Sequence, residues 1–310
     1  MRCSFKTIMD YNKKICYKQY ENEKYTRLID KNAKLCYTQI SKERKDDYMF
    51  CAKNFVSPQS LEEAWQLNQK KANKIAGGML WLKMSKQNFD TIIDLSLLGL
   101  DKIEENENAF EIGAYVTLRD LEKNEALNDY CNCAVRDAVK SIVGVQFRNC
   151  ATVGGSIFGR YGFSDVLSVF LSMNTVVELY KGGEMPLEDF IKSDCKNDIL
   201  VKIKVLKDGG RYYYQSVRNT KTDFPVLTCA AAAKGNKIRL VFGARPFAAK
   251  AFEYDFETDK QSPEEIGNEI ALKVKNDVEV YSNMRGSAEY RAHLAGVLAK
   301  RACLKLGGAE

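Results

Sequence analysis

The chain has 310 residues, enough for two domains with substantial cores. Its composition, with 45% hydrophobic and 28% charged residues, is typical of globular proteins, and its longest apolar runs fall short of the ~20 residues that a membrane-spanning helix needs. The net charge is +6, but nearly all of it lies in the first 48 residues, so the rest carries no basic stripe for nucleic acid.

Residues 1–48 form a segment with its own composition. They contain 12 Lys and Arg against 7 Asp and Glu, and they have neither glycine nor proline. Three interpretations of this N-terminal extension remain open: an extra helical arm, a partner-binding tail, or sequence translated from upstream of a true start at Met49, which we slightly favour. The segment lacks the unbroken apolar core of a signal peptide. We therefore expect a cytoplasmic protein that does not bind membranes.

The elements that follow the extension mix helix and strand. Ser60 precedes LEEAWQL, which has carboxylates in its first turn and apolar residues at helical spacing, so we expect a capped helix there. NKIAGGMLWLKM predicts a short strand, a Gly-Gly turn and an apolar continuation, and FDTIIDLSLL predicts another strand. Residues 103–117 indicate a hairpin with a polar turn.

The middle of the chain is richer in helix. Residues 118–143, LRDLEKNEALNDYCNCAVRDAVKSIV, have helical periodicity. The stretch CATVGGSIFG, residues 150–159, is predicted to be a glycine-rich loop. DVLSVFLSM then predicts a helix, and TVVELYKGGEMPL predicts a strand with a turn.

A third region begins near Gly209-Gly210. RYYYQSVRNTKTDFPVLTCAAAAKGNKIRLVFGARP alternates and is interrupted by Gly-Asn and Gly-Ala, which predicts three antiparallel strands. SPEEIGNEIALKVKNDV, with its Ser-Pro start, and SAEYRAHLAGVLAKRACLKL predict two amphipathic helices. Strands followed by helices indicate an α+β domain.

Cysteine and histidine usage narrows the chemistry. None of the 10 cysteines form a C-x-x-C pair, so neither a zinc site nor an iron–sulfur cluster is indicated, and we expect buried free thiols in a reducing compartment. The only histidine, His293, lies on the last predicted helix, where we expect a surface or packing role. The chain does not look like a hydrolase.

Two Gly-Gly units stand out, each predicted to follow a strand and to continue into apolar residues: AGGML at 76–80 and TVGGS at 152–156. Glycine lets backbone N–H groups approach an anion closely. Thr152 and Ser156 add hydroxyl groups, and Asp165 could accept from sugar hydroxyls. Neither unit fits the Rossmann or P-loop pattern, and Gly-Gly pairs are also common in hairpins. The residues alone predict a nucleotide-like anion held between two lobes.

The order of these motifs resembles the FAD-binding subunits of molybdenum hydroxylases, the family of the xanthine, carbon monoxide and nicotinate dehydrogenase flavoproteins. The resemblance runs from about residue 49 to 307 and is most specific over RNCATVGGSIF and the SD that follows. It implies an α+β protein with a bipartite FAD-binding fold of the vanillyl-alcohol-oxidase (PCMH) type and a small α+β C-terminal domain. The implied domains are 49–206, with subdomains of about 49–104 and 105–206, and 209–310.

The resemblance also implies which residues hold FAD. The backbone of the first Gly-Gly unit would wrap the pyrophosphate from one side, and the second unit would close on the diphosphate and ribityl from the other. Asp165 would hold a sugar hydroxyl, and Leu200 would pack against the flavin ring, although core packing explains Leu200 equally well. The implied FAD-binding residues are Ala76, Gly77, Gly78, Met79, Leu80, Thr152, Gly154, Gly155, Ser156, Asp165 and Leu200. We assign no acid–base and no metal-ligating residue.

Three departures from the family pattern bear on flavin affinity. Met79-Leu80 stands where the family usually has Thr-Asp, and Ser156 stands where it has asparagine. A lysine that some members use near the flavin edge aligns roughly with Gln215, and Arg218 is a candidate substitute. We therefore expect weakened affinity for FAD.

The function implied by the resemblance is electron transfer in a xanthine dehydrogenase-like oxidoreductase. Electrons from iron–sulfur clusters would reach FAD on this chain and leave to NAD or another acceptor. An iron–sulfur subunit and a molybdopterin-binding subunit would be separate partners, because this chain has neither the cysteine arrays nor the length for them. Two alternatives remain open: a degenerate scaffold subunit that has lost FAD, and a stand-alone flavin oxidoreductase.

Overall fold

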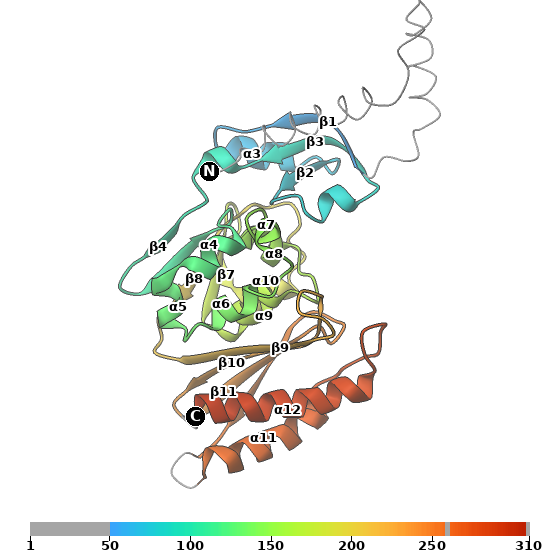
Figure 1. Ribbon diagram of the computed structural model, residues 1–310. Helices are drawn as coiled ribbons and strands as arrows, with labels where there is room; N and C mark the ends of the chain where they lie inside the picture. The colour runs from blue at the N-terminus through green and yellow to red at the C-terminus, as the bar shows by residue number, and fades with distance from the viewer. Residues whose placement is uncertain (1–49, 258–260, 308–310) are drawn as a thin grey trace, which may run out of the picture. The chain divides into compact units, whose positions relative to one another are not determined.

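The computed structural model describes residues 50–257 and 261–307, and these described residues belong to one compact unit. The extension predicted for residues 1–48 lies outside the described residues. Within the described part of the chain, the strands form three sheets (Figure 1). No helix in this part is both long enough and apolar enough to cross a bilayer.

The first sheet is small and parallel, with the order β1-β3-β2. Helix α3 connects β1 to β2 and packs on β2 and β3. As predicted, α3 begins at Ser60, whose hydroxyl accepts a hydrogen bond from the N–H of Glu63. Strand β1 was not predicted. The elements are β1 (Cys51–Val56), α3 (Leu61–Asn68), β2 (Asn73–Ala76), the 3-10 helix η1 (Leu82–Met84), β3 (Asn88–Asp94) and the 3-10 helix η2 (Ser96–Leu98).

The second sheet has five strands in the order β4-β5-β8-β6-β7, and all its neighbouring strands are antiparallel. The predicted hairpin is confirmed as β4 and β5, and the predicted strand with a turn is confirmed as β6 leading into β7. The strands are β4 (Ile103–Glu105), β5 (Ala109–Gly113), β6 (Thr175–Leu179), β7 (Gly183–Pro186) and β8 (Leu200–Leu206), with α10 (Leu187–Lys192) after β7.

The helical region 118–143 is divided into three short helices: α4 (Leu118–Lys123), α5 (Glu125–Tyr130) and α6 (Ala134–Val139). Asn124 ends α4 and also caps α5, because its side chain accepts from the N–H of Leu127. The chain turns again before α6, where Asn132 and Cys133 have positive φ angles of 49° and 61°.

The loop predicted around the second Gly-Gly unit is wrong: the two glycines lie inside helix α8 (Val153–Phe158), which follows α7 (Val145–Arg148). No strand precedes the glycines; Thr152 caps α8 by accepting from the N–H of Gly155. The buried residues Val153 and Ile157 are four apart and anchor the helix on one face. The next helix, α9 (Asp165–Ser172), is as predicted, and all of its residues are buried.

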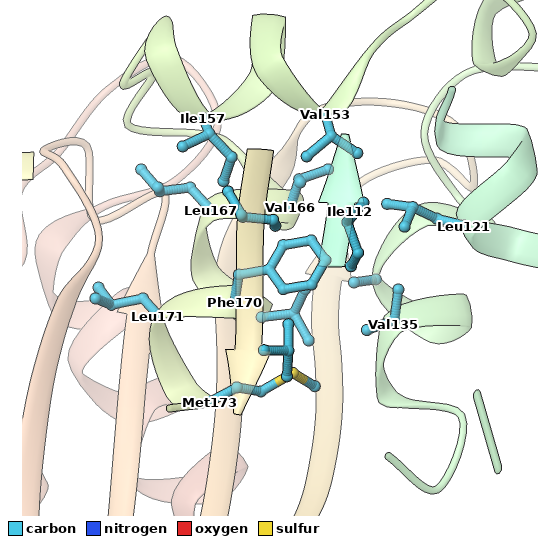
Figure 2. Packing of buried hydrophobic residues seen from close by; sticks show 14 of the residues in the cluster. Ile112, Leu121, Val135, Val153, Ile157, Val166, Leu167, Phe170, Leu171 and Met173 are labelled. Atoms are coloured by element: carbon cyan, nitrogen blue, oxygen red, sulfur yellow. The ribbon is translucent and has the colours of Figure 1, made fainter. Parts of the chain in front are cut away.

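Helix α9 lies at the centre of the largest hydrophobic core. Figure 2 shows Phe170 of α9 between Val166, Ile112 of β5 and Met173. The same helix packs on β10 and β11 of the third sheet. Because α9 contacts both the core that includes β5 and the third sheet, the helix is held in place from two sides.

The third sheet has the order β12-β11-β10-β9, with all neighbours antiparallel. Strands β9, β10 and β11 are the three that were predicted, whereas β12 was not predicted. Both predicted C-terminal helices are confirmed, and they lie together below the sheet in Figure 1. The elements are β9 (Arg211–Arg218), β10 (Pro225–Lys234), β11 (Lys237–Gly243), β12 (Lys250–Asp255), α11 (Pro263–Asp277) and α12 (Ala288–Leu306).

Strand β10 is buried on both faces. Ala231 and Ala233 belong to the core that includes α11 and α12, whereas Ala230 belongs to the core of α9. This alternation follows from the two-residue period of a strand, and burial on both sides explains the uniformly apolar run TCAAAA. The end of β9 lies near the start of α9, because Arg218 forms an ion pair with Asp165.

The thiols and the histidine are placed largely as expected. All described cysteines are free; Cys131, Cys229 and Cys303 are buried, but Cys51 is exposed and the others are half-buried. His293 lies on α12 with its side chain exposed.

Candidate functional site

The candidate site is a cavity of about 460 Å³, within the size range of pockets for small ligands and cofactors. Its wall is made by the loop after β2, by α8, by the start of α9, by the start of β8 and by the loop between β9 and β10. Ala76 and Gly78 are not part of the wall. The predicted residues that line it are Gly77, Met79, Leu80, Thr152, Gly154, Gly155, Ser156, Asp165 and Leu200.

The first Gly-Gly unit makes a sharp turn after β2. Gly78 and Met79 both have positive φ angles, 74° and 60°. Among the described residues, no group accepts a hydrogen bond from the backbone N–H of Met79, Leu80 or Trp81, and all three residues line the cavity. Successive free N–H groups in such a turn form a concave anion-binding site.

Tyr115 fixes the end of β2 behind this turn. Its hydroxyl donates to the carbonyl oxygen of Ala76 and accepts from the N–H of Leu95 at 2.9 Å. Burial raises the pKa of Tyr115, so its hydroxyl keeps the proton that it donates. Ala76 therefore supports the turn from behind the cavity wall.

The glycines of both units let two stretches of backbone touch. A Cβ atom on Gly77 would lie 3.0 Å from Oγ1 of Thr152, and one on Gly155 would lie 3.0 Å from the carbonyl oxygen of Gly77. A Cβ atom on Gly78 would clash with the carbonyl oxygen of Cys150. These glycines therefore do more than let a ligand approach the backbone, because they also bring the two segments together.

The second unit has no comparable set of free N–H groups. The N–H of Gly154 donates to the carbonyl oxygen of Ala114 at 2.8 Å. Those of Gly155 and Ser156 donate to Oγ1 and the carbonyl oxygen of Thr152, each at 3.1 Å. Ser156 also donates its hydroxyl to the Thr152 carbonyl oxygen at 2.9 Å. What remains for a ligand is the hydroxyl proton of Thr152, the lone pairs of the Ser156 hydroxyl, and the open surface over Gly155.

Asp165 has a partner from the third sheet. Its Oδ1 lies 2.5 Å from Nη2 of Arg218 and accepts a further hydrogen bond from the hydroxyl of Tyr214. Burial raises the pKa of Asp165, and the positive charge of Arg218 opposes that rise. Because both bonds use Oδ1, Oδ2 is the atom that could accept from a sugar hydroxyl.

The charged and apolar parts of the wall include residues that the sequence did not single out. Lys74 and Lys196, which were not predicted, bring positive charge to the cavity, whereas Leu200, which was predicted and is only 5% exposed, lines it from the first position of β8. Gln215 and Arg218 were the two residues considered at the position of the family lysine near the flavin edge. Arg218 lines the cavity, whereas the side-chain amide of Gln215 donates to the carbonyl oxygen of Leu298 at 2.8 Å. No sequence motif marks Lys74 or Lys196, because only the fold brings them to this wall.

Four of the aromatic residues that line the cavity lie close to one another, and none of the four was predicted to line it. They come from three segments, and no sequence spacing connects them. They are Trp81, Tyr161, Phe163 and Phe224.

The wall fits a dinucleotide with a diphosphate. Free N–H groups and two lysines suit the phosphate oxygens, the hydroxyls of Thr152 and Ser156 suit phosphate or sugar oxygens, and most of the remaining wall is apolar, as heteroaromatic rings require. Nothing in the donor set conflicts with FAD.

Comparison with known proteins identifies the family. A family model described as the FAD binding domain in molybdopterin dehydrogenase matches residues 49–205. A second model, the CO dehydrogenase flavoprotein C-terminal domain, matches residues 211–306. The first match spans the Gly-Gly units, Asp165 and Leu200.

Related proteins and solved structures support the same family assignment. The glyceraldehyde dehydrogenase medium chain of Sulfolobus acidocaldarius is 27% identical over 272 residues, which is 80% of this chain and 96% of that protein. The uncharacterized protein YgfM of Escherichia coli K12 is 28% identical over 251 residues, 79% of this chain and 92% of YgfM. Carbon monoxide dehydrogenase from Hydrogenophaga pseudoflava, solved without the Mo-pyranopterin moiety of its cofactor, has the same fold, with a TM-score of 0.71 at 21% identity over 83% of this chain and 97% of that chain. The chain therefore belongs to the FAD-binding domain family of the molybdopterin dehydrogenases, and FAD is its cofactor.

Proposed function

We propose that this chain is the FAD-carrying electron-transfer subunit of a molybdenum hydroxylase complex. The observation that carries the proposal is one cavity, in a chain of this family, that is lined both by Met79, Leu80 and Trp81, whose N–H groups have no acceptor among the described residues, and by Thr152 and Ser156. Bound FAD supplies the redox chemistry, taking up electrons from one carrier and releasing them to another, while the protein binds and orients it.

Each part of the wall has a role in this proposal. The N–H groups of residues 79–81 hold the diphosphate, and Lys74 and Lys196 balance its negative charge. Oδ2 of Asp165 accepts from a sugar hydroxyl, and Leu200 packs against a ring. The FAD-binding part is of the vanillyl-alcohol-oxidase (PCMH) type and covers residues 49–206, and residues 209–310 form the C-terminal domain.

The proposed electron route needs other chains. Electrons enter from an iron–sulfur subunit, which receives them from a molybdopterin-binding subunit, and they leave to NAD or another acceptor. The names of similar proteins, a glyceraldehyde dehydrogenase medium chain and a carbon monoxide dehydrogenase, support a dehydrogenase subunit. They differ in substrate, so the xanthine dehydrogenase-like form is one hypothesis to test beside aldehyde and carbon monoxide oxidation.

The first experiment is the visible absorption spectrum of the purified full-length chain, with the released cofactor identified after denaturation. We expect the bands of oxidised flavin and about one FAD per chain, either as purified or after incubation with FAD, because the cavity is a single site. A colourless chain that takes up no added FAD would overturn the proposal and favour the scaffold alternative.

A second experiment separates an electron-transfer subunit from a stand-alone flavin enzyme. The chain is purified alone and as a complex by an affinity tag, and both preparations are assayed with a purine, an aldehyde and carbon monoxide. We expect turnover only in the complex, together with molybdenum and iron in the co-purified chains. Turnover of one of these substrates by the FAD-loaded chain alone would favour the stand-alone alternative.

A further inference from the structure

The four aromatic residues Trp81, Tyr161, Phe163 and Phe224 form one continuous surface of the cavity, which we call the aromatic wall. The ring centroid of Trp81 lies 6.2 Å from that of Tyr161, 5.7 Å from that of Phe163 and 5.5 Å from that of Phe224. Phe163 and Phe224 meet edge to face at 4.6 Å. Three separate segments of the chain thus converge on this wall.

The indole of Trp81 has no stacked partner in the described part of the chain. Its plane makes angles of 50°, 58° and 32° with the three other rings, whereas Tyr161 and Phe163 are stacked at 14° and 5.2 Å. Trp81 and Tyr161 are each 38% exposed. An exposed indole with no parallel neighbour, on the wall of a cavity, offers a face for a planar ring.

Contacts with Arg285, Asp223 and Arg218 hold the Phe224 segment of the aromatic wall in place. The guanidinium carbon of Arg285 lies 4.8 Å from the ring centroid of Phe224. The N–H of Phe224 donates to Oδ1 of Asp223 at 2.7 Å, and the carbonyl oxygen of Asp223 accepts from Nη1 of Arg218 at 2.5 Å. A surface held in this way loses little conformational entropy when a ligand stacks on it.

Trp81 also belongs to the proposed diphosphate site, because its free N–H is the last of the three in that turn. A ligand with its diphosphate in the turn therefore has a ring within reach of the indole. We propose that the aromatic wall receives a planar heteroaromatic ring of the bound dinucleotide, stacked on Trp81. The inference rests on the proposed function, since FAD brings both the diphosphate and the rings, isoalloxazine and adenine.

The test compares dissociation constants of FAD, measured by equilibrium dialysis, for the full-length chain and for Trp81→Leu, Trp81→Phe and Trp65→Phe. Trp65 is the control: it is the other of the chain's 2 tryptophans, lies outside the cavity wall, and has the ammonium of Lys181 5.0 Å from its ring centroid. We expect Trp81→Leu to weaken binding by about 5- to 150-fold, the equivalent of about 1–3 kcal/mol of ring stacking. Trp81→Phe keeps an aromatic face and loses less, and Trp65→Phe binds as the unchanged chain does.

Two fragments of FAD decide which ring lies on the wall. FMN carries the isoalloxazine with one phosphate, and ADP carries the adenine with the diphosphate. Stacking on Trp81 predicts that Trp81→Leu and, to a lesser extent, Trp81→Phe weaken one of the two fragments and leave the other unchanged. A folding defect would weaken both equally, so an equal loss for both fragments in Trp81→Phe overturns the inference.

The outcomes also separate this inference from the proposed function. If the unchanged chain binds FAD and Trp81→Leu binds it equally tightly, the ring lies elsewhere and only the inference fails. If the unchanged chain binds no FAD, FMN or ADP, the proposed function fails and the inference fails with it.

Discussion

At the scale of single residues, Gly78 has the strictest backbone requirement in the site. Its φ is 74°, and a Cβ atom there would clash with the carbonyl oxygen of Cys150. We expect Gly78→Ala to lower the free energy of unfolding by about 2–5 kcal/mol, because left-handed strain and overpacking add. Urea unfolding monitored by circular dichroism measures this loss.

Gly183 provides the matched control. It has nearly the same φ, 67°, but a Cβ atom there would meet no group of the described residues within 4 Å. Gly183→Ala therefore costs only the backbone strain, about 1–2 kcal/mol, and leaves FAD binding unchanged, whereas Gly78→Ala also weakens FAD binding. Equal losses of stability for the two variants would show that the contact with Cys150 does not constrain the turn.

The pair of Asp165 and Arg218 leads to a second prediction. Both side chains are buried, at 5% and 8% exposure, and removal of one partner from a buried pair typically costs about 3–5 kcal/mol. We expect Arg218→Met to lose about this much of the free energy of unfolding. The double variant Asp165→Asn, Arg218→Met leaves no unpaired charge and should recover most of the loss. A double variant as unstable as Arg218→Met would argue that the guanidinium matters through packing alone.

The same pair predicts the pH dependence of the Arg218→Met variant. Burial raises the pKa of Asp165 and Arg218 opposes the rise, so without Arg218 the pKa moves further up. The folded state then binds a proton that the unfolded state releases, and stability falls as pH increases, by up to about 1.4 kcal/mol per pH unit. Unfolding at pH 6 and pH 8 should show a larger deficit at pH 8, and the Asp165→Asn, Arg218→Met control should not. A deficit independent of pH would contradict this prediction.

At the scale of elements, substitution of Thr152, the N-cap of α8, tests whether this residue contributes to cofactor binding as well as to stability. Thr152 accepts from the N–H of Gly155 and lines the cavity. Ser287 caps α12 in the same way, by accepting from the N–H of Tyr290, and does not line the cavity. We expect Thr152→Ala and Ser287→Ala each to cost about 1 kcal/mol of unfolding free energy, measured by urea unfolding.

The effect on FAD should differ between these two cap variants. Thr152→Ala frees the N–H of Gly155 but removes a hydroxyl from the wall, so its dissociation constant for FAD, measured by equilibrium dialysis, should increase. Ser287→Ala should leave that constant unchanged. If both variants bind FAD equally well, the hydroxyl of Thr152 is a cap and nothing more.

Elements with strong local signals could be predicted from the sequence. Helix α11 has Ser262 at its N-cap, Pro263 at its first position and Glu265 completing a capping box, and each of these signals is local. Helix α8 was missed because its two adjacent glycines are typical of a loop, and this signal was given more weight than the helix-capping residue Thr152. Strands β1 and β12 are at sheet edges with irregular burial patterns, so no clean alternation marks them.

The candidate site could be predicted only where a motif carried it. The Gly-Gly units and Asp165 lie in contiguous, recognisable stretches, and the structure brings most of these residues to one cavity. Lys74, Trp81 and Phe224 meet there through tertiary contacts that no sequence spacing encodes. The domain boundaries and the role of each residue in holding FAD remain predictions.

At the scale of the whole molecule, the wall of the cavity is formed both by residues that precede the third sheet and by residues of the third sheet itself. This wall includes the loop after β2 and α8, but also Phe224 from the loop between β9 and β10. The ion pair of Asp165 with Arg218 links the start of α9 to β9, and α9 itself packs on β10 and β11. A ligand in the cavity therefore contacts the third sheet and the elements that precede it at the same time.

This arrangement predicts that FAD stabilises the described unit as a whole. A ligand that binds only the folded state adds about 2.7 kcal/mol at 100 times its dissociation constant. Two probes report on different parts: in the Trp81→Phe background, emission comes from Trp65 on α3, whereas far-ultraviolet circular dichroism weights the long helices α11 and α12. We expect one transition, coincident for both probes, that moves to higher urea with increasing FAD. If FAD shifted the Trp65 transition and left the circular dichroism transition in place, the C-terminal helices would unfold independently of the cavity, and the link through α9 and Arg218 would be too weak to couple them.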